Sequence, residues 1–313
     1  MNFAEQFAEM YPRSKNIWDI LSSFLGGKSF GALTKRDICD LYKYAGALSK
    51  TRRFQIDNIQ QDFSESDAVV YWLIKNFEAY KKALENWDFK KQEYGRSHNN
   101  TVPHITPEKL PPEKLRQVRY EKYIEMWLYD KFKDDQLPAI VYDANLKKLG
   151  EASIGECKGY EQYLKSGSGE AIDLITVQRS GNKSKVYLLE LKSGFSQETL
   201  LRCLLEAYTY AKMVKPEWRK DLFQKLNVND CDAQIVICPL FFDVPTSRQS
   251  KEFWEAVRSP SPAIKDLARK IEEIERNVIK VEFALLDPES LPGEIQEWLN
   301  FECQRKSQNE KQV

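Results

Sequence analysis

Two apolar segments joined by a short polar turn constrain this chain most, because they have the pattern of neighbouring strands in one sheet. The first runs from Ala171 to Gln178 and the second from Val186 to Lys192. Between them lies RSGNKSK, which is rich in residues that favour turns. The pattern predicts a β-hairpin inside a folded domain.

Charged residues interrupt both segments. Asp173 lies within AIDLIT, and Glu190 and Lys192 lie at the end of VYLLELK. Side chains alternate along a strand, so Glu190 and Lys192 should share one face while Leu191 points to the other. Because unpaired charges are costly to bury, the arrangement makes best sense if Asp173 and Glu190 hold a divalent cation with the amine of Lys192 beside it.

Hydrophobic periodicity predicts the elements around the hairpin. Before it we expect a helix over Leu115–Phe132, a short strand over Ala139–Tyr142 and a partly helical segment over Glu151–Leu164. After it we expect a helix that is capped by Ser196 and stopped by Pro216. An apolar strand over Ala233–Phe242, a helix over Ala263–Arg276 and an alternating strand over VIKVEFALL should follow. The fold class is therefore mixed α/β.

The chain divides into two predicted units. Residues 1–95 have a helical pattern, most clearly over Ser66–Gln92, and we expect an all-helical N-terminal region. Residues 96–112 are rich in proline and polar residues, which is typical of a linker. Residues 113–300 form the second domain, with a helix-strand-helix extension at its C-terminal end. The polar residues 301–313 are expected to be a mobile tail.

Composition excludes several classes of protein. The chain has 313 residues and only two histidines, so a histidine-based site is not indicated. Its formal net charge is zero, which counts neither for nor against an acidic partner, and any surface that binds nucleic acid must be local. Its six cysteines form no CxxC pair, which favours reduced thiols in the cytosol. No signal peptide or long apolar span is visible, so we expect a cytoplasmic protein without a membrane partner.

The predicted element order resembles that of the PD-(D/E)XK phosphodiesterase superfamily. The order is a helix, a strand, a strand with Asp173, a strand with Glu190-Leu191-Lys192, a helix and a strand. The resemblance covers about residues 113–243, includes Gly194, and implies a restriction-endonuclease-like mixed sheet core flanked by helices. A second Glu-x-Lys at residues 156–158 lacks the apolar run and the capped helix that accompany Lys192. The triplet at Glu190 is therefore the better candidate.

The resemblance implies a metal-dependent nuclease that hydrolyses phosphodiester bonds in DNA, with RNA as the alternative. Asp173 and Glu190 would bind Mg²⁺ or Mn²⁺, and the carbonyl of Leu191 would complete the protein ligands. Lys192 would orient or help to deprotonate the attacking water. A cytoplasmic, bacterial role in defence or repair also follows from the resemblance alone.

Two further acids match family positions. Glu121 on the first helix fits the family's additional acid, which would hold a second ion or a water. On the helix after the triplet, Glu206 and Tyr210 have the spacing of a Gln-x-x-x-Tyr pair found in some nucleases, with Glu in place of Gln. The alternative is that Glu121 and Glu206 simply reach solvent, as acids on helices usually do.

The substrate is expected to contact basic side chains near this edge of the sheet, which would neutralise phosphates: Lys158, Lys165, Arg179, Lys183 and Arg202. Two alternatives stay open. Asp173, Glu190 and Lys192 could form a structural ion pair at a strand end. The domain could also be a catalytically inactive module that binds nucleic acid or a protein partner, and the N-terminal helical region could itself dock a partner.

Overall fold

The computed structural model describes most of the second predicted domain and part of the first. The described residues are 51–56, 59–86, 120–160, 172–194, 196, 198–214, 216–229, 233–276, 278–291, 293 and 296. The predicted linker over residues 96–112 and the tail over residues 301–313 lie outside them.

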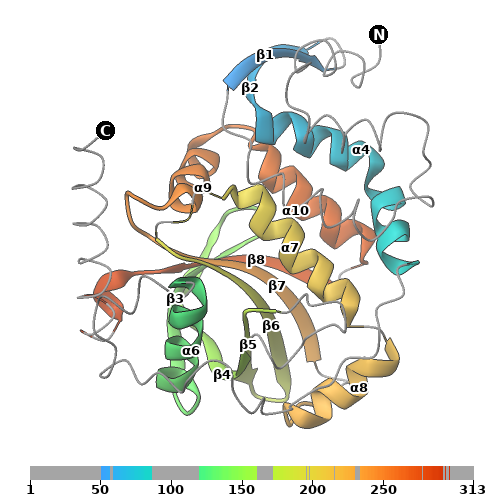
Figure 1. Cartoon of the computed structure of the whole chain (residues 1–313). Coiled ribbons are helices and arrows are strands. Elements are labelled where there is room, and N and C mark those ends of the chain that lie inside the picture. The colour runs from blue at the N-terminus through green and yellow to red at the C-terminus, as the bar shows by residue number, and fades with distance from the viewer. Residues whose placement is uncertain are drawn as a thin grey trace.

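A six-stranded mixed sheet forms the centre of the molecule (Figure 1). Its strands are β3 Gln136–Asp143, β4 Lys148–Tyr160, β5 Leu174–Ser180, β6 Lys183–Lys192, β7 Ala233–Phe242 and β8 Ile279–Leu286. Strands β3 to β6 are antiparallel neighbours, whereas β7 and β8 continue the sheet in parallel with β6. A short antiparallel pairing of β3 with β8 closes the sheet into a barrel.

The β5–β6 hairpin forms where the sequence predicts it. Leu174 pairs with Leu189 at one end and Ser180 with Lys183 at the other. Gly181 makes the turn with a φ of +58°, a conformation that glycine adopts without strain. The strongly apolar β6 then pairs with β5 on one side and β7 on the other, so its side chains are buried along most of its length.

Helices cover both faces of the sheet. On one face, α6 (Tyr120–Phe132) packs against β3, β4 and β6 through Ile124, Trp127 and Leu128. The other face carries a larger group of helices, which includes α7 and α10 lying across the strands in Figure 1: α4 Glu65–Glu85, α7 Leu200–Met213, α8 Pro216–Lys225, α9 Arg248–Arg258 and α10 Ala263–Ile274. The mixed α/β architecture is thus confirmed.

Helix α4 shares the core of the sheet domain. Its apolar stripe, formed by Val70, Leu73, Phe77, Tyr80 and Leu84, is fully buried against α7 and α10. Spacing of three and four residues places these side chains on one side of the helix, as the sequence predicts for this segment.

Three local predictions were wrong, and two α-helices were not predicted. The N-terminal region is not all-helical, because residues 51–64 contain a β-hairpin of β1 (Thr51–Ile56) and β2 (Ile59–Ser64). The segment over Glu151–Leu164 is not helical where it is described, since it belongs to strand β4. Helix α7 begins after Thr199, whose hydroxyl accepts from the amide of Arg202, and not at Ser196. Helices α8 and α9 were not predicted.

Candidate metal centre

Strand register brings Asp173 next to Glu190. Leu174 is opposite Leu189 in the last pair of the hairpin, and Asp173 directly precedes Leu174, so continuing the register would place Asp173 opposite Glu190. Directly opposed residues share a face and have Cβ atoms about 5 Å apart. The amide of Leu191 donates to Asp173 Oδ2 at 2.8 Å, which ties the aspartate to the end of β6. The two predicted acids therefore meet at one edge of the sheet.

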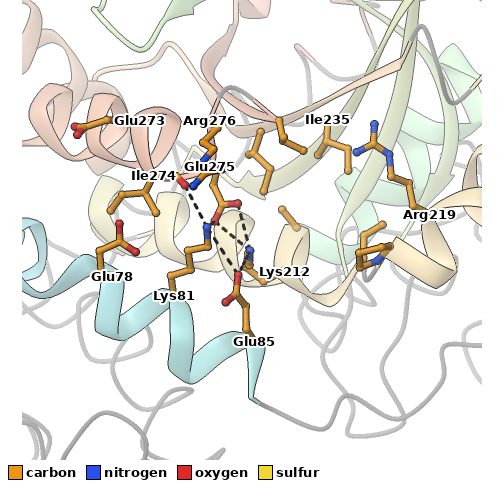
Figure 2. A pocket seen from close by; sticks show the side chains of 15 residues that line it. Glu78, Lys81, Glu85, Lys212, Arg219, Ile235, Glu273, Ile274, Glu275 and Arg276 are labelled. Carbon is orange, nitrogen blue, oxygen red and sulfur yellow. Dashed lines mark hydrogen bonds and ion pairs between the residues drawn. The ribbon is translucent and has the colours of Figure 1, made fainter.

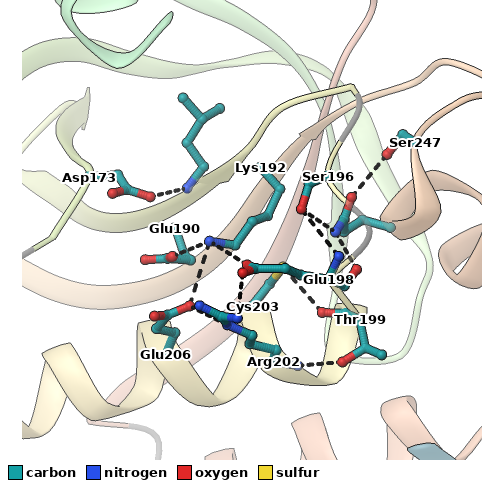
Figure 3. Close-up of polar contacts among 12 residues, drawn as sticks. Asp173, Glu190, Lys192, Ser196, Glu198, Thr199, Arg202, Cys203, Glu206 and Ser247 are labelled. Carbon is teal, nitrogen blue, oxygen red and sulfur yellow. Dashed lines mark hydrogen bonds and ion pairs between the residues drawn. The ribbon is translucent and has the colours of Figure 1, made fainter. Parts of the chain in front are cut away.

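Lys192 lies in the same cluster, on the face that α7 covers (Figure 3). Its Nζ donates to Glu190 Oε1 at 2.6 Å, while Leu189 and Leu191 point into the opposite core. Glu190 and Lys192 are only 3% and 4% exposed. Alternation along β6 thus buries an acid and an amine together, as the sequence predicts.

Three carboxylates surround the Lys192 ammonium. Besides Glu190, Glu198 Oε2 lies 3.1 Å and Glu206 Oε2 lies 3.6 Å from Nζ. Glu206 comes from α7, and Glu198 precedes the N-cap of that helix. The lysine therefore joins a strand to the start of a helix through ion pairs that are shielded from solvent.

The electrostatics of Glu190 are unfavourable for its charged form. Burial, followed by the negative charges of Asp173 and Glu206, raises the pKa of Glu190 well above its usual range, and the opposing effect of Lys192 does not cancel this. Its Oε2 is buried and has no hydrogen-bond partner among the described residues. A buried carboxylate oxygen without a partner is costly, and a cation beside it would stabilise the charged form.

Glu206 behaves differently because two cations face it. Burial alone would raise its pKa, but the charges of Lys192 and Arg202, together with hydrogen bonds to Glu190 and Arg202, lower the pKa of Glu206 below its usual range. Arg202 lies one turn earlier on α7, and its Nε is 3.4 Å from Glu206 Oε2. Glu206 is therefore held as a carboxylate beside Glu190.

Helix α9 holds the loop that leads into α7. Gln249 donates to the hydroxyl of Ser196 at 3.3 Å and also to the carbonyl of Glu198. Glu252 accepts from the amide of Leu200 at 2.6 Å, so a carboxylate lies at the N-terminus of α7, where the helix dipole favours negative charge. The position of Glu198 is thus fixed from outside its own segment.

These residues fit a divalent cation. Mg²⁺ is usually bound by one or two carboxylates together with waters, and Asp173 and Glu190 supply two at one strand edge. A dication there would partner the buried lone pairs of Glu190 Oε2 and relieve its repulsion from Asp173. Within the described residues no group of three or more His, Cys, Asp or Glu side chains has an arrangement suited to a metal.

The other predicted ligands and accessory residues are distributed as follows. Glu121 belongs to α6, but its side chain lies outside the described residues. Glu206 joins the cluster around Lys192, so it does not point to solvent. Tyr210, one turn further along α7, is buried in the larger core.

The predicted phosphate-binding residues do not converge. Arg202 reaches the cluster, where it pairs with Glu198 and Glu206. Arg179 and Lys183 flank the hairpin turn, six residues of strand from Asp173, which corresponds to about 20 Å. Lys158 pairs with Glu156 and donates to the carbonyl of Lys133 at 3.4 Å. Lys165 lies outside the described residues.

Sequence reasoning missed Glu198. The periodicity of a helix or a strand does not relate Glu198 to Lys192. The two residues are close because the loop between β6 and α7 turns back toward the strand. The available signal was its place directly before the N-cap Thr199.

A separate pocket of about 780 Å³ lies at the opposite end of α7 (Figure 2). Its wall contains Glu275, which accepts from Tyr208 at 2.6 Å and from Lys212 at 3.1 Å. Lys81 of α4 lies 3.6 Å from the same carboxylate. The lining charges balance, with four acids and four cations among its residues: Glu78, Glu85, Glu273, Glu275, Lys81, Lys212, Arg219 and Arg276. This pocket contains none of the predicted site residues.

Comparisons with known proteins give no further guide to identity. No family model, no curated protein and no solved structure matches the chain. Among the described residues, no helix combines the length and apolar character that crossing a membrane requires. The chemistry of the cluster at the end of β6 is therefore the basis for assigning a function.

Proposed function

We propose that this protein is a metal-dependent nuclease of the PD-(D/E)XK superfamily that hydrolyses phosphodiester bonds in DNA. The observation that carries the proposal is the meeting of Asp173, Glu190 and Lys192 at one edge of the sheet, where Glu190 has a buried, unpartnered oxygen. RNA is the alternative substrate, and a cytoplasmic bacterial role in defence or repair belongs to the same proposal.

The arrangement of elements supports the proposal. Helix α6, strands β3, β5 and β6, helix α7 and strand β7 follow each other in the order on which the resemblance rests, with β4 inserted between β3 and β5 and α8 between α7 and β7. Asp173 directly precedes β5, and the Glu190-Leu191-Lys192 triplet ends β6. We propose that these elements are a restriction-endonuclease-like core, to which β4 and β8 are added, and in which the pairing of β3 with β8 closes the sheet.

The residues have distinct roles in the proposed reaction. Asp173 and Glu190 would hold Mg²⁺ or Mn²⁺, together with the carbonyl of Leu191. When bound, the ion supplies Lewis-acid activation of water and of the phosphodiester. The ammonium of Lys192 offsets negative charge that develops on the phosphoryl oxygens, and its burial strengthens this effect. The Leu191 amide holds Asp173 in place.

A catalytically inactive module is the second candidate. The observation in its favour is that Lys192 is engaged by three carboxylates, as in a structural ion-pair network. Such a module would bind nucleic acid or a protein partner without cleaving it. It would have no need for an unpartnered oxygen on Glu190, which is why the enzyme is preferred.

Cleavage assays distinguish the two candidates. Plasmid and single-stranded DNA, and RNA in parallel, are incubated with the full chain and Mn²⁺. We expect Asp173→Asn, Glu190→Gln and Lys192→Met each to reduce the cleavage rate by about 100-fold or more, since each removes a charge that acts at the reacting group. Asp130→Asn and Lys220→Met, which change exposed residues of the same types, serve as matched controls.

The result that contradicts the proposal is cleavage that survives all three substitutions in protein that remains folded. Binding of nucleic acid by the wild-type chain without any cleavage would instead support the inactive module. Circular dichroism of every variant separates loss of the site from loss of the fold.

A further inference from the structure

Lys192 lies between two groups of carboxylates on different elements. Glu190 is its neighbour on β6, with Oε1 at 2.6 Å from Nζ. Glu198 lies in the loop before α7, with Oε2 at 3.1 Å. Figure 3 shows the ammonium between these two groups, with Glu206 on the α7 side. Only Glu190 is also a proposed ligand of the metal.

The contact with Glu198 is an ion pair without a hydrogen bond. Glu198 Oε2 is buried and has no hydrogen-bond partner among the described residues, although Nζ is close. Its Oε1 pairs with Arg202, and its backbone carbonyl accepts from Gln249 of α9. The carboxylate is therefore held in place with one oxygen directed to Lys192 and still available as an acceptor.

A cation at Glu190 changes the balance around Lys192. The ammonium and the metal would compete for the same carboxylate, and the two positive charges would repel each other. Glu198 offers an acceptor that the proposed metal does not use, and Glu206 adds negative charge on the same side. A small rotation of the lysine side chain would exchange the hydrogen bond to Glu190 for one to Glu198.

We propose that Glu198 is a positioning residue: it accepts the hydrogen bond of the Lys192 ammonium when Asp173 and Glu190 bind a divalent cation. This inference rests on the proposed function, because it assumes that the two acids bind a metal. Glu198 keeps the ammonium beside the site and at the same time removes it from competition for Glu190.

A double-mutant cycle of Mn²⁺ binding to the full chain tests this role. Binding is measured by the loss of the free Mn²⁺ electron paramagnetic resonance signal, for the wild type, Glu198→Gln, Lys192→Met and the double variant. We expect Glu198→Gln alone to weaken Mn²⁺ binding by about tenfold, the usual scale for residues that support metal ligands. In the Lys192→Met background the same change should have an effect of less than about twofold, because no competing ammonium remains.

Equal weakening in both backgrounds would overturn the inference, because Glu198 would then act directly on the cation as one more negative charge. Absence of weakening by Glu198→Gln in the wild-type background would overturn it as well. Glu78→Gln, an exposed change on α4, controls for general loss of negative charge. Asp173→Asn tests the proposed metal centre itself.

The two proposals fail in different ways. If the wild type binds no Mn²⁺, or Asp173→Asn binds it equally well, the metal centre is wrong and the role of Glu198 falls with it. If binding requires Asp173 but the cycle shows no interaction, only the role of Glu198 is wrong.

Crystals of the wild type grown with Mn²⁺ give a second measurement that needs no variant. Lys192 Nζ should donate a hydrogen bond to Glu198, and an ammonium that still donates to Glu190 beside bound Mn²⁺ contradicts the inference.

Discussion

At the scale of single residues, Glu190 carries an energetic cost that its neighbours only partly offset. It is buried beside Asp173 and Glu206, and its Oε1 accepts a hydrogen bond from Lys192. A core built only for stability would avoid such a carboxylate, since apolar or neutral residues are often as good as a buried ion pair. The cost is understandable if the acid is retained for a cation.

Glu190→Gln should therefore stabilise the metal-free protein at high pH. The folded-state pKa of Glu190 is raised above the value of about 4.3 expected in the unfolded chain. Its contribution to stability is then fully present below the unfolded pKa and is lost as pH rises through the raised folded pKa. The free energy of unfolding is measured with urea and EDTA at pH 5 and pH 8. Relative to the wild type, the variant should be more stable at pH 8 than it is at pH 5. A difference that is the same at both pH values contradicts this account of Glu190.

The sequence predicted the shared face of Glu190 and Lys192 because strand alternation is a local property. It also placed Asp173 in the adjoining strand, and the short turn of the hairpin then fixes the register that brings Asp173 to Glu190. Glu198 and the α9 residue Gln249 could not be predicted, since their positions depend on a loop and on a helix distant in sequence.

At the scale of elements, β4 shows why a strand can escape sequence prediction. It contains four charged residues and three glycines, at Gly150, Gly155 and Gly159, so it lacks the apolar run of a central strand. Its pairing with β3 shifts register between Ser153 and Glu156, where Gly155 has a φ of +93°. Bulges of this kind use glycine because other residues are strained at positive φ.

Gly155→Ala should destabilise the protein by about 2 kcal/mol or more, from backbone strain together with overpacking. A Cβ at this position would lie 2.3 Å from the carbonyl carbon and oxygen of Val177 on β5. Gly150→Ala is a matched control, because its φ is +138° but no atom lies within 4 Å of the added Cβ. Thermal unfolding should show the larger loss for Gly155→Ala, and equal losses would mean that the close approach of β4 to β5 is not the cause.

At the scale of the whole molecule, α4 and the sheet domain form one core. The sequence predicts a boundary after residue 95 because the composition changes there. Helix α4 lies before that boundary, yet it buries its apolar stripe against α7 and α10 of the sheet domain. Lys81 and Lys212 reach the same buried carboxylate, Glu275, from α4 and α7. Long-range packing of this kind leaves no local signal. For the same reason the β3–β8 pairing that closes the sheet was not predicted.

Phe77→Ala should weaken the whole fold by about 3–5 kcal/mol, the usual cost of removing a buried aromatic ring. Phe77 is fully buried and packs against Tyr208 of α7 in a tilted arrangement, with 5.1 Å between the ring centroids. Lys82→Ala, at an exposed site on the same helix, should change stability by no more than about 0.5 kcal/mol. Denaturation followed by fluorescence should give a single transition at lower urea concentration for Phe77→Ala. Independent melting of α4, with the sheet unaffected, contradicts a shared core.

The most direct measurement of the central claim is an anomalous difference map from crystals of the full chain grown with Mn²⁺. The account predicts a peak bound by Asp173 and Glu190 at about 2.0–2.5 Å from their oxygens, which is lost in Asp173→Asn. A map with Mn²⁺ bound elsewhere and none between these two carboxylates would contradict the proposed metal centre, and with it the proposed nuclease mechanism.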